Sequence, residues 1–130
     1  MTHYLSPQQV LFIHARLITA TGGEHDVRDM ALLQSAVARP QATFDGDDLY
    51  PTLPDKAAAL MHSLLFNHPF IDGNERTAVV AAALFLQRNH HELTAGSGEL
   101  ERFTISVLRD RLSPATIATW FRVHCPPTLP

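Results

Sequence analysis

The chain has 130 residues, of which 45% are apolar and 18% charged, and it carries a formal net charge of −3 with a pI of about 6.2. This length supports one hydrophobic core, so we expect a single domain over residues 1–130. A slightly acidic chain is not typical of proteins that bind nucleic acid or anionic membranes, so neither partner is expected.

Membrane insertion and disulfide bonding are also not expected from the sequence. The longest uninterrupted apolar stretch, Ala78 to Leu86, has nine residues, whereas a membrane-spanning helix needs roughly 20. The first ten residues do not resemble a secretion signal, and the single cysteine, Cys125, cannot form an internal disulfide. Together these features predict a soluble protein of the reducing cytoplasm.

Two helices are predicted in the first 40 residues. The first extends from Pro7 to Ala20, because Ser6 and Gln9 suit a capping box and apolar residues recur at helical spacing. The second is short, with Asp29 as its N-cap and Pro40 as its end.

Residues 39–54 are predicted to form a loop or short β-hairpin. This stretch contains three prolines and an Asp-Gly pair, which favour turns over helix. Its aromatic residues Phe44 and Tyr50 are expected to be exposed, and a loop of this length is often functional. We refer to residues 39–54 as the flap.

The rest of the chain is predicted to be helical. A third helix extends from Asp55 to Asn67, and a fourth ends at about Asn89, with Asp72, Gly73 or Asn74 as its cap. Residues 78–86 of this fourth helix are apolar on every side, which places it in the middle of the fold.

A fifth helix buries Phe103, Val107 and Leu108, a sixth begins at Ser113-Pro114, and residues 126–130 are expected to fray. The predicted fold class is therefore all-α, a bundle of five or six helices around a central hydrophobic one.

The stretch HPFIDGNER, residues 68–76, brings polar and charged residues to the start of the most apolar helix. The first amides of a helix are unpaired and carry partial positive charge, so they can bind an anion, and Gly73 allows a close approach of the backbone. Arg76 in the first turn calls for a compensating anion such as a phosphate. Asp72 could bring magnesium to that phosphate, and His68 suits general base catalysis at neutral pH.

A structural interpretation of the same residues remains open. Asp72 and Asn74 are common helix caps, His68 alone could be structural, and Glu75 could simply complement the helix dipole. That interpretation explains neither Arg76 nor Gly73.

The stretch also resembles the signature of the Fic/Doc family. The flanking segments RDMALLQSAVARP and RTAVVAAALFLQRN resemble the death-on-curing (Doc) branch, which comprises the toxins of toxin–antitoxin operons, and the likeness covers roughly residues 5–125. The family fold is a small helical bundle with the motif between its two central helices. Seven of the nine signature positions match the family pattern: His68, Pro69, Phe70, Asp72, Gly73, Asn74 and Arg76.

This resemblance implies roles for the motif residues. His68 would deprotonate a hydroxyl of a target protein, Asp72 would hold Mg²⁺, and Phe70 would anchor the loop in the core. Nucleotide phosphates would be bound by Asn74, Arg76 and the loop amides, among them those of Gly73 and Glu75. Fic proteins transfer AMP, whereas Doc proteins transfer the γ-phosphate of ATP to a threonine of elongation factor Tu and so stop translation.

Position 75 departs from the family pattern, because Fic proteins have glycine there and Doc proteins have lysine, whereas this chain has Glu75. A carboxylate directed at a triphosphate weakens its binding unless a cation intervenes. Three interpretations remain open: Glu75 is a second metal ligand, it selects a less charged nucleotide, or it marks a catalytically weakened toxin.

The resemblance also implies partners. The flap would lay a target segment beside itself by strand pairing, with Phe44 and Tyr50 assisting the docking. The C-terminal segment of a small, Phd-like antitoxin would fold over the active site. Besides the Doc-like kinase, we consider nucleotidyl transfer, or a weakened module that binds antitoxin or nucleotide, as alternatives. A metal-dependent hydrolase lacks the ligand spacing it would need.

Overall fold

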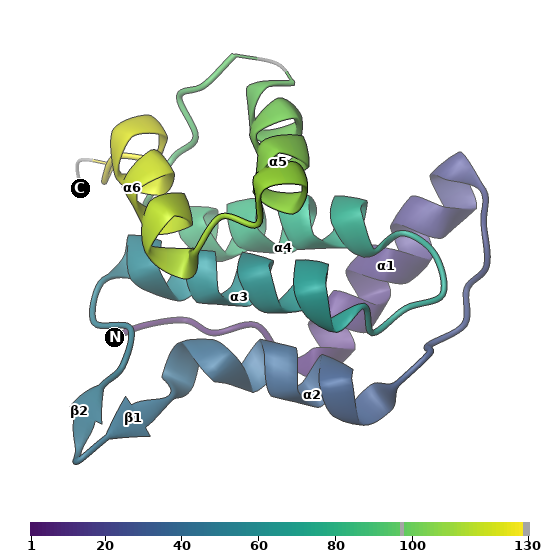
Figure 1. The fold of residues 1–130 in the computed structure, drawn as a ribbon, viewed down its shortest axis with the longest axis horizontal. Helices are drawn as coiled ribbons and strands as arrows, with labels where there is room; N and C mark the ends of the chain where they lie inside the picture. Colours follow the sequence, from purple (N-terminus) through teal and green to yellow (C-terminus); the bar gives the residue numbers. More distant parts are fainter. Residues whose placement is uncertain (97, 129–130) are drawn as a thin grey trace.

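The computed structural model describes residues 1–96 and 98–128, and this part of the chain contains six α-helices, one 3-10 turn and a two-stranded antiparallel hairpin (Figure 1). The predicted all-α fold class is confirmed. The elements are α1 (Pro7–Thr21), α2 (Met30–Ala38), η1 (Arg39–Gln41), β1 (Thr43–Phe44), β2 (Asp47–Asp48), α3 (Leu53–Asn67), α4 (Asn74–Arg88), α5 (Glu99–Asp110) and α6 (Pro114–His124).

The centre of the fold is the pair α3 and α4, which lie side by side across the middle of the molecule (Figure 1). Helices α2 and α6 pack against α3, while α1 and α5 pack against α4. The expected central hydrophobic helix is α4, which packs against α1, α3 and α5, and α3 shares the central position with it. Val80, inside the apolar stretch of α4, is 37% exposed.

Helix α3 begins at Leu53, two residues before the predicted start at Asp55. Thr52 is the N-cap: its hydroxyl accepts a hydrogen bond from the Asp55 N–H at 3.2 Å, and the Asp55 carboxylate accepts one from the Thr52 N–H at 3.3 Å. Pro54 fits the first turn because that position needs no N–H donor. The capping box therefore extends the helix into the proline-containing stretch that we assigned to the flap.

The flap contains a hairpin that turns at Asp45 and Gly46, both with positive φ, +51° and +83°. Two consecutive residues with positive φ match the twist of a two-residue hairpin loop, and Asp-Gly is a preferred sequence for it. Phe44 pairs with Asp47 in the register of this hairpin, which projects from one end of the bundle (Figure 1).

Two cations fix the flap to the body of the protein. Lys56, buried on α3, donates to the Pro40 carbonyl at 3.3 Å and to the Asp48 carboxylate at 3.2 Å. Arg39, which is itself in the flap, donates from Nη1 to the Ser63 hydroxyl on α3 at 2.9 Å and from Nε to the Tyr50 hydroxyl at 2.8 Å. These contacts hold the hairpin in one orientation relative to α3.

Residues 126–128 of the C-terminal tail, which we expected to fray, form hydrogen bonds with the rest of the chain. The Thr128 N–H donates to the His90 carbonyl at 2.7 Å, and the Glu92 N–H donates to the Pro126 carbonyl at 3.1 Å. Residues 126–128 therefore pair with the turn after α4, while residues 129–130 lie outside the described residues. Within the described ranges, no helix combines the length and apolar character needed to span a bilayer.

Candidate active site

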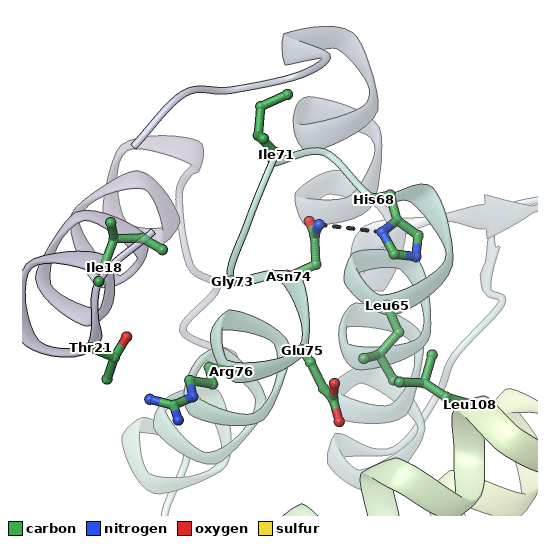
Figure 2. A pocket seen from close by; sticks show the side chains of 11 residues that line it. Ile18, Thr21, Leu65, His68, Ile71, Gly73, Asn74, Glu75, Arg76 and Leu108 are labelled. Atoms are coloured by element: carbon green, nitrogen blue, oxygen red, sulfur yellow. Dashed lines mark hydrogen bonds between the residues drawn. The ribbon is translucent and has the colours of Figure 1, made fainter. Parts of the chain in front are cut away.

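Six of the nine residues of the HPFIDGNER stretch line a cavity of about 470 Å³ (Figure 2). Its walls come from the C-terminal end of α1, the end of α3, the loop from α3 to α4, the first turn of α4, and one residue of α5. The lining residues are Ile18, Thr21, Gly22, Leu65, His68, Ile71, Gly73, Asn74, Glu75, Arg76 and Leu108.

His68 is exposed at the rim of this cavity, at the C-cap of α3. Its backbone is left-handed, with φ +49° and ψ 58°, a conformation uncommon for residues other than glycine. Arg28, which precedes α2, stabilises this end of the helix: its guanidinium donates to the His68 carbonyl at 2.7 Å and to the Asn67 carbonyl at 2.8 Å. The histidine is therefore held at a fixed point on the rim.

Asn74, at the start of α4, is buried and binds the loop rather than reaching into open space. Its Oδ1 accepts from the Phe70 N–H at 3.0 Å, and its Nδ2 donates to the Phe70 carbonyl at 2.9 Å. Nδ2 also lies 3.3 Å from His68 Nδ1 (Figure 2). Both hydrogens of Nδ2 are thus in use. This geometry therefore favours a structural role for the Asn74 side chain over the phosphate binding that we expected.

Phe70 is 1% exposed and lies in the core, as expected for the loop anchor. Its ring stacks on the imidazole of His14, with 3.7 Å between ring centroids and 5° between planes. His14 Nε2 lies 2.8 Å from the Asp72 carbonyl oxygen. The loop between α3 and α4 therefore rests on a histidine of α1.

Helix α4 starts without a side-chain cap, with Gly73 as N-cap at φ +81°. Within the described part of the chain, the backbone N–H groups of Gly73, Asn74, Glu75 and Arg76 donate no hydrogen bond to the protein. Of the three cap candidates, Asp72, Gly73 and Asn74, only Gly73 occupies the N-cap position. The uncapped amides and the helix dipole favour an anion at this point.

Two opposite charges lie in the first turn of α4. The side chains of Glu75 and Arg76 are exposed and diverge, with Arg76 on the side of Thr21 and Glu75 on the side of Leu108 (Figure 2). Among the described residues, the Arg76 guanidinium forms no salt bridge. Arg76 is therefore available to an anion, and Glu75 contributes a carboxylate to the wall of the same cavity.

Asp72, the predicted magnesium ligand, is exposed but does not line the cavity. Its Oδ2 accepts a hydrogen bond from the Glu24 N–H at 2.8 Å, which leaves Oδ1 for another partner. No cluster of three or more His, Cys, Asp or Glu side chains suited to a metal ion occurs in the described residues. One available carboxylate oxygen fits a magnesium ion that keeps its waters and also binds phosphate oxygens, and it does not make a site built by protein ligands alone.

The two aromatic residues predicted for docking have different positions. Phe44 is 71% exposed on the hairpin. The Tyr50 hydroxyl is engaged by Arg39, and the Tyr50 ring lies 5.5 Å from the Arg39 guanidinium. Tyr50 therefore stabilises the base of the flap, whereas Leu49, which we did not single out, is 54% exposed beside it.

Sequence reasoning missed His14 and Arg28. His14 lies next to Ile13, among the apolar positions of α1. This position was the one signal in the sequence that the histidine is buried. Arg28 has no local signal, because its partners are backbone carbonyls 39 and 40 residues away.

Comparison with known proteins matches the chain to a family and to two relatives. A family model described as the Fic/DOC family matches residues 4–86. The chain is 54% identical over 95 residues to "Toxin Doc" of Mycolicibacterium smegmatis, an alignment that covers 73% of this chain and 71% of the relative. It is 27% identical over 119 residues to "Protein kinase doc" of Escherichia phage P1, covering 92% of this chain and 93% of the relative.

The motif, the helical bundle around it and these two relatives agree with one another, and the chain therefore belongs to the Fic/DOC family.

Proposed function

We propose that this protein is the toxin of a toxin–antitoxin pair, a kinase that transfers the γ-phosphate of ATP to a protein hydroxyl. The acceptor we propose is a threonine of elongation factor Tu, so that the reaction blocks translation in the cytoplasm. The observation that carries the proposal is the uncapped start of α4 with Arg76 in the same cavity as His68. The printed names of the two relatives, a toxin and a protein kinase, support it.

The phosphates of the nucleotide bind at the start of α4 in this proposal. The unpaired N–H groups of residues 73–76 supply donors, and Arg76 supplies a cation with the planar geometry that suits phosphate. Phosphoryl transfer depends mainly on positioning and charge stabilisation, and these groups provide both.

His68 acts as the general base. The acceptor hydroxyl gives its proton to the imidazole as its oxygen forms a bond to the γ-phosphorus, and the bond from that phosphorus to the bridging oxygen breaks, releasing ADP. Because Asn74 Nδ2 is a donor, His68 Nδ1 is the acceptor in the resting arrangement and is the basic nitrogen. The contact is long, at 3.3 Å, so the acceptor hydroxyl can replace it at little cost.

Asn74 is then a positioning residue rather than a phosphate ligand. It holds the Phe70 peptide groups and orients His68, while its backbone N–H remains available to the phosphate. Asp72 would hold Mg²⁺ through Oδ1, and the ion would neutralise charge on the phosphate oxygens.

The flap is the proposed docking element for the acceptor protein. Phe44 and Leu49 present exposed apolar side chains, and Lys56 and Arg39 hold the hairpin in place. A short hairpin with an unpaired edge can add a strand from a partner.

The proposed antitoxin site is the groove next to the active site. A second cavity of about 370 Å³ lies between α1, α4 and α5 and shares Glu75 and Arg76 with the first. Its other lining residues include Leu17, Val79 and Val80, an apolar surface that suits a folding C-terminal segment of a Phd-like antitoxin. An occupant of this groove would cover the phosphate site.

A second candidate function is a nucleotide- or antitoxin-binding module with little catalysis. The observation that favours it is Glu75, whose carboxylate lines the cavity where a triphosphate would lie. Glu75→Lys distinguishes the two: a gain of transfer indicates a disabled enzyme, and a loss indicates that the carboxylate has a working role.

Label transfer tests the proposed function. The purified protein and its His68→Ala variant are incubated with elongation factor Tu, Mg²⁺, and ATP labelled at either the α or the γ phosphate. We expect label from the γ position alone, lost in the variant. Label from the α position would indicate nucleotidyl transfer instead, and the absence of both labels would favour the binding module.

A further inference from the structure

We propose that His14 is a positioning residue that directs the Gly73 amide toward the bound phosphate. This inference deepens the proposed function, because it concerns the same anion site. His14 lies on α1, is 2% exposed and does not line the cavity, so it cannot act on a substrate directly.

The hydrogen bond from His14 has a defined direction. A carbonyl oxygen can only accept, so Nε2 carries the hydrogen in its 2.8 Å contact with the Asp72 oxygen. The stacked Phe70 ring fixes the plane of the imidazole and therefore the direction of this donor. The buried imidazole of His14 therefore holds the Asp72 carbonyl toward α1.

The peptide between Asp72 and Gly73 transmits this constraint. The described chain contains no cis peptide bond, and in a trans peptide the C=O and the following N–H point in opposite directions. Holding the Asp72 carbonyl toward His14 therefore turns the Gly73 N–H away from His14. Gly73 lines the cavity, and its N–H has no hydrogen-bond acceptor among the described residues.

The fit between His14 and the loop is close. A Cβ added at Gly73 would lie 3.4 Å from His14 Cδ2 and 3.0 Å from Ile18 Cδ1, so the imidazole fills the space directly beneath the turn. Any loss of the ring would allow the 72–73 peptide to rotate, because the neighbouring glycine does not restrict it. The amide would then no longer point in a fixed direction, and the anion site would lose its preorganisation.

The experiment measures anion binding at the Gly73 amide directly. In ¹⁵N-labelled protein, inorganic pyrophosphate is titrated without magnesium, and the Gly73 amide resonance is followed together with the apparent Kd. The variants are His14→Gln, whose distal amide can still donate to the Asp72 carbonyl, and His14→Met, which fills similar space without a donor. Val10→Ala is the control, because Val10 is fully buried on α1 one turn earlier.

We expect wild type to show a large shift of the Gly73 amide, with His14→Gln within about twofold of its Kd and His14→Met at least fivefold weaker. A difference of fivefold is about 1 kcal/mol, within the range for a single hydrogen bond. Val10→Ala should lower Tm and leave the Kd unchanged, which separates positioning from stability.

The inference is overturned if the Gly73 amide of wild type does not respond to pyrophosphate, if His14→Met binds as wild type does, or if His14→Gln is as weak as His14→Met. If His14→Met does not fold, wild type and His14→Gln still decide it, because a Kd for His14→Gln at least fivefold weaker than that of wild type also overturns the inference. The proposed function is tested separately. If the protein binds pyrophosphate at Gly73 but transfers no label from ATP, the inference about His14 stands and the proposed kinase activity is contradicted.

Discussion

Arg28 donates a hydrogen bond of 2.7 Å to the backbone carbonyl of His68, across 40 residues of sequence. Its second bond, to the Asn67 carbonyl at 2.8 Å, satisfies another carbonyl at the C-terminal end of α3. Segment 26–29 supports the loop further, because the N–H groups of Arg28 and Asp29 donate to the Pro69 carbonyl. The position of the proposed general base therefore depends on a residue outside the motif.

Arg28→Ala should lower the rate of label transfer by about tenfold and the free energy of unfolding by about 1 kcal/mol, the typical net value of an intramolecular hydrogen bond. Arg28→Lys keeps the charge and one donor and should lose less of both. Urea unfolding and transfer kinetics measure the two quantities. A normal rate in Arg28→Ala would show that His68 does not need this support.

Gly73→Ala should impair both folding and anion binding. At φ +81° an alanine costs about 1–2 kcal/mol, and its Cβ would also meet Ile18 Cδ1 at 3.0 Å. Gly46→Ala is the matched control, because Gly46 has a similar φ of +83° with no atom within 4 Å of an added Cβ. Calorimetric unfolding should show a larger loss for Gly73→Ala, and only this variant should bind Mg·ATP more weakly. Equal losses in the two variants would contradict the close packing beneath the loop.

His62 should make the stability of the protein depend on pH. Burial, together with the nearby guanidinium groups of Arg39 and Arg111, lowers the pKa of His62 below its ordinary value. Arg39 Nη1 lies 3.1 Å from His62 Nδ1 and donates to it, which also requires the neutral imidazole. The unfolded chain therefore binds a proton at a higher pH than the folded protein does.

The sign of this effect follows from the lowered pKa. Above the ordinary histidine pKa of about 6.5 the residue contributes nothing, and as pH falls from there to the lowered value the folded state loses stability. Urea unfolding at pH 7.5 and pH 5.5 should show a larger loss for wild type than for His62→Gln, which keeps an acceptor for Arg39. An equal or smaller loss in wild type would exclude this linkage.

The sequence predicted the helices well because their signals are local. Ser6, Asp29 and Ser113 each cap a helix, as their sequence positions indicate. The start of α3 was missed because the Thr52–Asp55 capping box stands among prolines that also favour turns. The location of the site was predicted by a motif whose nine residues are contiguous.

The arrangement within the site was harder to predict. Asn74 and Asp72 have the residue types of ligands, but in the structure the Asn74 side chain binds Phe70 and one Asp72 oxygen binds Glu24. Such contacts depend on how loop and helices pack in three dimensions, and sequence spacing carries no information about them. The same holds for His14, whose partner Asp72 is 58 residues away.

The central claim is that the uncapped start of α4 binds the phosphates of a nucleotide, and Mg·ATP binding to an arginine variant tests it most directly. Calorimetric titration compares wild type with Arg76→Ala and with Arg88→Ala, which removes an arginine from the opposite end of α4. We expect Arg76→Ala to bind at least tenfold more weakly, a loss of about 1.4 kcal/mol or more, and Arg88→Ala to bind as wild type does. Equal affinity in wild type and Arg76→Ala would contradict the account.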